Sequence, residues 1–215
     1  MKLVLQGLYF ITDRALSRKS VVEDVEAAIR GGSRIVQYRD KSLDDDEMTA
    51  EAKAIAAVCK KAGVLFIVND RVKVALASGA DGIHIGPYDT DFLEVRKALG
   101  GDKIIGVTVN SADDAKRFEK LGADYVSLSP VFSTSTKKDA GEPIGLGVIS
   151  EAKKRLRIPF TVIGGINFDN LNAVLDAGAE SVCMMSAIIA KDDVEKEVKK
   201  VETIIHEHAA RKGKK

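Results

Sequence analysis

The sequence contains no tryptophan, two cysteines and four prolines, and aromatic residues make up only 5% of its 215 residues. Cys59 and Cys183 lie far apart and in no CxxC pattern, so neither a disulfide framework nor a zinc site is indicated. No stretch approaches the ~20 apolar residues of a membrane-spanning helix, and the apolar run at the start is too short for a secretion signal. These absences predict a cytoplasmic protein with no membrane partner.

Neither sign of charge is in excess, because 33 basic and 32 acidic side chains give a formal net charge of +1. Such a balance creates no global field that would hold nucleic acid, so any anion must be recognised locally. Apolar residues make up 45% and charged residues 30%, as in ordinary globular proteins, and the length suits one domain. The basic residues 206–215 are expected to form a frayed, solvated tail.

A glycine followed by a small residue recurs between amphipathic and apolar stretches. The four copies begin at Gly32, Gly79, Gly122 and Gly178. Glycine suits the left-handed residue after a helix end, and β-branched residues then begin a strand, so each copy predicts a helix-to-strand junction. Reading outward from these junctions predicts eight strands, at residues 8–12, 34–39, 65–69, 82–85, 104–109, 125–128, 160–163 and 181–184.

Strands and amphipathic helices alternate eight times, which predicts a parallel sheet with right-handed crossovers. Eight such units at this length favour a single α/β domain over residues 1–215, closed into a (β/α)₈ TIM barrel. A doubly wound open sheet is the structural alternative, although no glycine-rich dinucleotide-binding pattern follows the first strand. Active sites of such barrels lie at the carboxyl ends of the strands, so the residues there are the functional candidates.

Two aspartates follow neighbouring predicted strands: Asp70 comes after the third strand and Asp89 after the fourth. Mg²⁺ prefers oxygen ligands and is commonly held by one or two carboxylates together with substrate phosphate oxygens. Helix capping is the alternative for each aspartate taken singly, because each precedes a predicted helix. As a pair beside Arg39 and Lys41, the two aspartates favour a metal site.

The second predicted strand ends with Gln37, Arg39 and Lys41, which alternate to one side of an extended chain. Three polar groups would then point toward the barrel interior. The alternative is an ion-pair lattice that only fills a layer of the barrel. His84, near the end of the fourth strand, is expected to be a hydrogen-bonded structural histidine and receives no catalytic role.

Glycines and hydroxyl groups follow the later strands. Gly164 and Gly165 come after the seventh strand and Ser186 after the eighth, where such barrels commonly bind phosphate through backbone N–H groups. The alternative is a glycine pair that merely turns the chain. The long irregular segment 129–147 carries hydroxyls and two lysines, a composition suited to phosphate or pyrophosphate, or else to an exposed solvated loop.

In combination and in this order, these motifs resemble the thiamine phosphate synthase family over nearly the whole chain. The blocks that carry the resemblance are Gln37-x-Arg39-x-Lys41, Asn69-Asp70, Gly86-x-x-Asp89, Thr134-x-Thr136-Lys137-Lys138-Asp139, Gly164-Gly165-Ile166 and Ser186-Ala187-Ile188. The resemblance implies a transferase of thiamine biosynthesis, which transfers an alkyl (pyrimidinylmethyl) group. Hydroxymethylpyrimidine pyrophosphate would be condensed with thiazole phosphate to give thiamine phosphate and pyrophosphate.

The same resemblance implies Mg²⁺ as the cofactor, with Asp70 and Asp89 as its ligands. Catalytic groups that neutralise the leaving pyrophosphate would be Arg39, Lys41 and Lys137. Residues implied to bind the pyrimidine pyrophosphate are Gln37, Tyr38, Arg39, Asp40, Lys41, Asn69, Thr108 and Lys137. Residues implied to bind the thiazole phosphate are Thr134, Ser135, Thr136, Gly165, Met185 and Ser186.

Three positions depart from the family pattern, which has glutamine where Pro87 stands, serine where Thr108 stands and histidine where Asn110 stands. Thr108 keeps the hydroxyl group. Pro87 removes a backbone N–H and an amide side chain beside the implied metal loop, which puts in question the conformation that presents Asp89.

Two other functions stay open at this point. One is a thiazole tautomerase-like paralogue, which binds thiazole phosphate but lacks the pyrophosphate half of the site; Asp70, Asp89 and Lys41 argue against it. The other is a non-catalytic phosphate-binding protein of the thiamine pathway, which needs no Mg²⁺. Metal dependence separates these functions. Small-molecule substrates are the expected partners, nucleic acid is not, and a homo-oligomer is left open.

Overall fold

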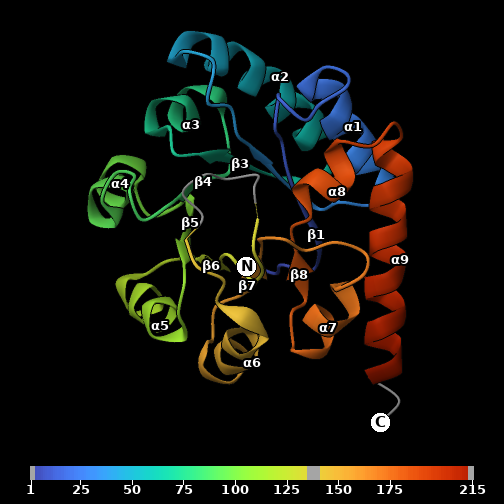
Figure 1. The fold of residues 1–215 in the computed structure, drawn as a ribbon. Coiled ribbons are helices and arrows are strands. Elements are labelled where there is room, and N and C mark those ends of the chain that lie inside the picture. The colour runs from blue at the N-terminus through green and yellow to red at the C-terminus, as the bar shows by residue number, and fades with distance from the viewer. Residues whose placement is uncertain (1–2, 135–140, 213–215) are drawn as a thin grey trace.

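In the computed structural model, which describes residues 3–134 and 141–212, parallel strands form a closed barrel with helices around it (Figure 1). The strands pair in sequence order, and β8 returns to β1. The strands are β1 (Gly7–Ile11), β2 (Ile35–Tyr38), β3 (Leu65–Asn69), β4 (Gly82–Ile85), β5 (Ile104–Val109), β6 (Tyr125–Leu128), β7 (Phe160–Val162) and β8 (Ser181–Val182). The closed order confirms the TIM barrel and excludes the doubly wound open sheet.

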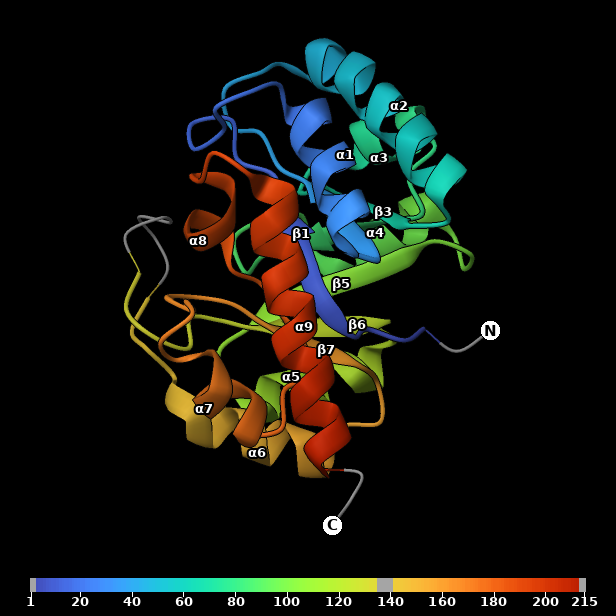
Figure 2. The same cartoon turned by 90° about the vertical axis from the view of Figure 1, so that its right-hand side faces the viewer.

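A helix follows each strand, and one further helix ends the described part of the chain. The helices are α1 (Val21–Gly31), α2 (Asp45–Ala62), α3 (Val72–Ser78), α4 (Phe92–Leu99), α5 (Ala112–Leu121), α6 (Gly145–Arg155), α7 (Leu171–Asp176), α8 (Met185–Ile189) and α9 (Val194–Lys212). Figure 2 shows α8 at one end of the barrel, while the amino-terminal segment leaves at the other. None of the helices in residues 3–134 and 141–212 is both long and apolar enough to cross a membrane.

Strand bounds follow the prediction closely in the middle of the sequence and less closely elsewhere. The bounds of β3, β4, β5 and β6 are those predicted. In contrast, β8 ends at Val182 rather than at residue 184. The backbone leaves the strand conformation by Met184, whose φ and ψ are −129° and 67°, and α8 then begins.

The recurring glycines lie at helix-to-strand junctions, as predicted. Their φ values of 114° at Gly32, 79° at Gly79, 95° at Gly122 and 112° at Gly178 all fall in the left-handed region, which disfavours side chains with a Cβ. A further feature of two copies was not predicted. The carboxylates of Asp81 and Asp124 accept the N–H groups of Phe66 and Ile105, and these bonds fix the starts of β3 and β5.

Two cores lie on the two faces of the barrel wall. One is the apolar layer between the strands and the helices, and the other fills the barrel interior. The interior contains the buried rings of Tyr9 and Tyr125, whose centroids are 5.9 Å apart. Gly106 makes room for them, because a Cβ at this position would lie only 2.0 Å from Cζ of Tyr125.

The end of the chain differs from the expected frayed tail. Residues 206–212 continue α9, and the last turns bond to α7: His208 Nε2 lies 2.8 Å from Asp176 Oδ1, and Lys212 Nζ donates to the Leu175 carbonyl. Farther up the same helix, Glu202 accepts the N–H of Leu8 in β1 at 2.7 Å. Lysine and histidine near a helix carboxyl end stabilise its exposed carbonyls, which explains why these turns stay ordered.

Candidate functional site

A cavity of about 400 Å³ opens at the carboxyl ends of the strands. Most of the predicted site residues that the structure describes line it. They are Gln37, Arg39, Lys41, Asn69, Asp70, Asp89, Thr108, Thr134, Gly165, Met185 and Ser186. Residues from β2 and β8, far apart in sequence, therefore contribute to one space, as the barrel topology predicts.

The two predicted metal ligands lie next to each other in the lining of this cavity. Asp70 has a φ of 59°, a left-handed conformation that turns its carboxylate toward the rim, where it forms an ion pair with Lys41. Asp89 accepts the N–H of Gly86 at 2.6 Å. Partial burial and then the neighbouring Asp70 carboxylate raise the pKa of Asp89 above its ordinary value. Such a shift is expected of a carboxylate that has a second carboxylate beside it.

Helix capping does not explain this carboxylate pair. The N-cap of α3 is Arg71 rather than Asp70, and the N-cap of α4 is Asp91, whose side chain accepts the N–H of Leu93. No cluster of three or more His, Cys, Asp or Glu side chains forms a metal site within residues 3–134 and 141–212. Two carboxylates completed by phosphate oxygens and water are a donor set that fits Mg²⁺ rather than zinc.

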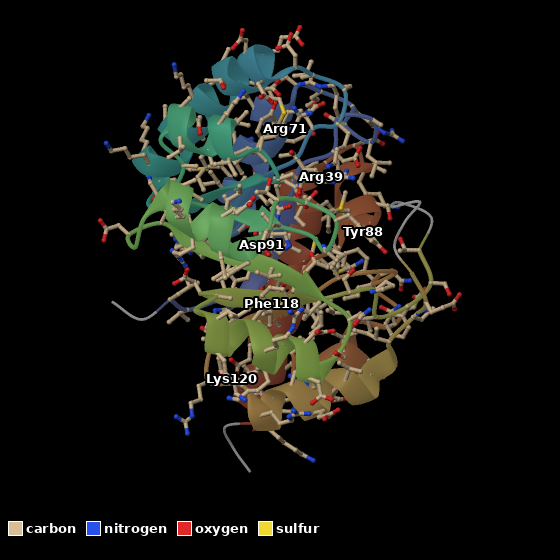
Figure 3. All side chains as sticks on the ribbon, turned by 90° about the vertical axis from the view of Figure 1, so that its left-hand side faces the viewer. Arg39, Arg71, Tyr88, Asp91, Phe118 and Lys120 are labelled. Carbon is tan, nitrogen blue, oxygen red and sulfur yellow. The ribbon has the colours of Figure 1, made fainter. Side chains whose placement is uncertain are left out.

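Positive charge stands beside the carboxylates. Arg39 is mostly buried, with its Nη1 atom 3.4 Å from Asp13 Oδ2, while Lys41 is half exposed at the rim. Figure 3 shows Arg39 and Tyr88 at the same end of the barrel, well away from Lys120 on α5. Arg39 pairs with Asp13 and Lys41 pairs with Asp70, and both cations line the cavity, where they can meet a bound anion.

Tyr38 and Asp40, implied to bind the pyrimidine substrate, do not line the cavity. The Tyr38 hydroxyl donates to Glu51 on α2, and the Asp40 carboxylate accepts a hydrogen bond from Arg14. Successive side chains of a strand point to opposite faces, so neighbours of the inward-facing Gln37 and Arg39 must turn outward. The two side chains therefore lie away from the cavity, and their role in binding the pyrimidine substrate stays a prediction.

On the far side of the cavity, two loops pack closely through glycine. Gly164 and Gly165 have φ values of 107° and 63°. A Cβ at Gly164 would lie 2.6 Å from Cα of Pro130, and one at Gly165 would lie 2.5 Å from the carbonyl oxygen of Ser133. Glycine is thus required both for the turn and for the approach of the loop after β6. Because both glycines line the cavity beside Ser186, their backbone is accessible to a bound anion.

The family model described as thiamine monophosphate synthase matches residues 8–188. The chain belongs to this family. A thiamine-phosphate synthase from Methanosarcina barkeri is 48% identical over 191 residues, which cover 89% of this chain and 86% of the relative. One from Clostridium novyi is 43% identical over 189 residues, covering 87% and 93%. The solved structure of thiamine phosphate pyrophosphorylase from Pyrococcus furiosus has a TM-score of 0.87 at 37% identity, covering 94% and 96% of the two chains.

The departure from the family pattern at Pro87 is compatible with the hydrogen bonds of the loop that presents Asp89. Asp89 donates its N–H to the Gly86 carbonyl at 3.3 Å, and Gly86 donates to the Asp89 carboxylate, so neither bond needs an N–H at residue 87. Thr108 Oγ1 lies 2.8 Å from His84 Nε2. Asn110 is exposed and does not line the cavity.

Part of the predicted site lies outside the described residues. Ser135, Thr136 and Lys137 fall in the segment 135–140, so their roles stay predictions. Thr134, at the edge of that segment, lines the cavity.

Sequence reasoning missed a hydrogen-bonded network that crosses the barrel interior below the cavity. Gln37 Nε2 donates to the Tyr9 hydroxyl at 2.9 Å, which lies 2.6 Å from the Tyr125 hydroxyl. That hydroxyl lies 3.0 Å from His84 Nδ1. Burial raises the pKa of both tyrosines well above the ordinary value, so both are neutral phenols at physiological pH. One sequence signal could have indicated this network: Tyr9 and Ile11 are two residues apart on β1, so their side chains point to the same side of the strand.

Proposed function

We propose that this chain is a thiamine-phosphate synthase. It condenses hydroxymethylpyrimidine pyrophosphate with thiazole phosphate and releases pyrophosphate, giving thiamine phosphate. The observation that carries the proposal is the facing pair Asp70 and Asp89 beside Lys41, in a cavity whose opposite wall is the glycine turn at Gly164 and Gly165. One wall suits a metal-bound pyrophosphate, and the other suits a second phosphate. Two phosphorylated small molecules are the substrates that such a site accepts.

The proposed division of the site follows the barrel. Gln37, Asn69 and Thr108 bind the pyrimidine, and Arg39 and Lys41 hold the pyrophosphate. Gly165, Met185 and Ser186 bind the thiazole phosphate, with Thr134 between the two halves. In the same proposal, Ser135 and Thr136 complete the thiazole site and Lys137 completes the catalytic charge.

The chemistry needs positioning and charge stabilisation more than a protein base. Departure of pyrophosphate leaves an electron-poor methylene carbon on the aminopyrimidine, and the thiazole nitrogen attacks that carbon. Arg39 and Lys41 stabilise the negative charge that grows on the leaving group. Mg²⁺ held by Asp70 and Asp89 would supply further charge neutralisation. Holding both substrates in one cavity makes their reaction effectively unimolecular.

The test mixes the purified protein with both substrates and Mg²⁺, and measures thiamine phosphate and released pyrophosphate. Asp70→Asn and Asp89→Asn should each lower kcat/KM by at least ~100-fold, because each removes a metal ligand of a charge-stabilising site. Both variants should keep the wild-type circular dichroism spectrum. Asp102→Asn, at an exposed carboxylate in the α4–β5 loop at the opposite end of the barrel, is the matched control.

Absence of product under every metal condition would overturn the proposal and favour a binding protein or the tautomerase-like paralogue. Turnover that survives in both aspartate variants would remove the metal assignment while leaving the synthase activity in place.

A further inference from the structure

The interior network is the continuous set of hydrogen bonds that joins Gln37, Tyr9, Tyr125, His84 and Thr108, from one side of the cavity floor to the other. Its two end residues line the cavity, and so do Tyr9 and His84, whereas Tyr125 does not. Its middle residues are almost entirely enclosed, with Tyr9 at 1%, Tyr125 at 0% and His84 at 6% exposure. The proposed function assigns the ends to the pyrimidine substrate but gives the three middle residues no role.

Each of the three middle residues donates only one hydrogen bond within the network, so the direction of one bond determines the direction of the next. A phenol has one proton, and a neutral imidazole has one N–H and one acceptor nitrogen. Since Gln37 donates to Tyr9, the Tyr9 proton must go to Tyr125, which is its other partner among the described residues. The Tyr125 proton then goes to His84 Nδ1, which leaves the His84 proton on Nε2.

The consequence appears at the far end of the network. His84 Nε2–H donates to one lone pair of Thr108 Oγ1, which lies 2.8 Å away. The hydroxyl proton of Thr108 is left to be donated to whatever the cavity binds. At the near end, one N–H of the Gln37 amide is donated to Tyr9, and the amide oxygen remains an acceptor. The network therefore couples an acceptor at Gln37 to a donor at Thr108.

We propose that Tyr9, Tyr125 and His84 are positioning residues, which fix the hydrogen-bond direction at both ends of the interior network and thereby select an aminopyrimidine. This inference rests on the proposed function. An aminopyrimidine offers N–H donors on its exocyclic amine and acceptors on its ring nitrogens, which complement an acceptor and a donor. An oxopyrimidine presents a carbonyl where the amine was and an N–H on the ring, so it meets like groups at both ends.

The barrel is built around this network. Gly106 leaves the space that the Tyr125 ring occupies, since a Cβ there would lie 2.4 Å from the Tyr125 hydroxyl oxygen itself. The same Cβ would also meet the ring carbon Cζ at 2.0 Å, so Gly106 makes room for the whole tyrosine side chain that carries the hydroxyl. Burial also keeps water from competing for the hydrogen bonds of the interior network. Because a buried polar group without a partner is strongly disfavoured, each bond keeps its direction.

The first measurement is made on the free protein and needs no turnover. A long-range ¹H–¹⁵N spectrum reports which imidazole nitrogen carries the proton, and the chain has only 3 histidines. His206 and His208 on α9 serve as internal references. The expected result is a proton on Nε2 and none on Nδ1 of His84. A proton on Nδ1 alone would mean that every bond runs the other way and would overturn the proposal.

The second measurement compares the Kd of two unreactive pyrimidinylmethyl monophosphates, one with the amine and one with a carbonyl in its place. The wild type should prefer the amine by about 100-fold or more, because a site built from paired polar groups rejects mismatched ones strongly. In Tyr125→Phe, which breaks the network but keeps the ring, this preference should fall at least about tenfold. The Kd of thiazole phosphate should change less than about twofold.

Ser181→Ala is the matched control, since it removes another buried hydroxyl of the barrel interior, one that bonds Thr161 instead of the network. It should leave the His84 tautomer and the amine preference unchanged. Tyr9→Phe is the second network variant if Tyr125→Phe does not fold. An unchanged preference in a folded network variant, or a wild type without preference, overturns the inference. Preference without thiamine phosphate synthesis would instead sink only the proposed activity.

Discussion

Asp40 offers the sharpest separation between a structural role and a substrate-binding role. Its side chain is 1% exposed and accepts bonds from Arg14 Nε at 2.6 Å, from the N–H and hydroxyl of Ser42 at 2.8 and 2.7 Å, and from the N–H of Leu43 at 3.1 Å. Because all four partners belong to the protein, Asp40→Asn should destabilise the fold rather than weaken substrate binding.

The magnitude follows from the partners. An asparagine keeps one acceptor oxygen but turns an NH₂ group toward another donor, which loses charge-assisted bonds worth roughly 1.5–3 kcal/mol each. A loss of about 3 kcal/mol in the free energy of unfolding is expected, equivalent to roughly 6–12 °C in Tm for a domain of this size. The KM for the pyrimidine pyrophosphate should rise less than about threefold, since one tenfold change requires ~1.4 kcal/mol of binding energy.

The pH dependence gives an independent check. Burial alone would raise the pKa of Asp40, but the bonds from Ser42 and Arg14 outweigh it and hold the pKa below the ordinary 3.8. A lowered folded-state pKa contributes stability that is present above pH 3.8 and is lost as the pH falls through the folded value. The stability difference between the wild type and Asp40→Asn should therefore shrink in strongly acidic buffer.

Urea unfolding followed by circular dichroism measures the stability, and steady-state kinetics measure KM. Asp192→Asn is the matched control, because Asp192 also pairs with an arginine, Arg18, but is 87% exposed; no measurable change is expected there. A variant of Asp40 with wild-type stability and a greatly increased KM would refute the reasoning and return Asp40 to the substrate site.

Other expectations concern packing and titration. Gly106→Ala should cost about 1–3 kcal/mol by urea unfolding, because the new Cβ meets the Tyr125 ring at 2.0 Å, whereas Gly101→Ala, with nothing within 4 Å, should not. Burial raises the pKa of Glu202 above 4.5 in the folded protein. The contribution of the neutral carboxyl group to the free energy of unfolding is therefore complete below pH 4.5 and is lost as the pH rises through the folded-state pKa. Glu202→Gln should therefore gain stability relative to the wild type as the pH rises; a constant difference across that range would contradict this.

The sequence predicted the barrel because the signal for it is local. Gly79 and Gly122 end helices, and the apolar run after each glycine is a strand in the structure. Asp81 and Asp124, which lie two residues after these glycines, give no comparable local signal. Their bonds to the strand starts at Phe66 and Ile105 join residues 15 and 19 positions apart, and hydrophobic periodicity carries no information about such bonds.

The site could be predicted to the same extent and for similar reasons. Position after a strand was enough to bring Asp70 and Asp89 to one rim. A place within the Gln37–Lys41 motif does not put the side chain of Tyr38 in the cavity, because adjacent residues of a strand point to opposite faces. Tyr9 and Tyr125 are 116 residues apart, and only closure of the barrel brings their hydroxyls together. Hydrogen bonds between side chains across a barrel interior depend on the register of the strands and on the orientation of the aromatic rings, and a single sequence gives neither.

The glycine at position 106 and the ring at position 125 occupy a single shared volume inside the barrel. That volume can be filled from either strand, by a methyl group on β5 with a short aliphatic side chain on β6, or by glycine with an aromatic ring. Both fillings would pack. Only the second carries an oxygen atom across the interior from Tyr9 to His84. The residue at position 106 therefore determines whether position 125 can hold an aromatic ring, and a chain that exchanged both residues would lose the hydroxyl group that joins Tyr9 to His84.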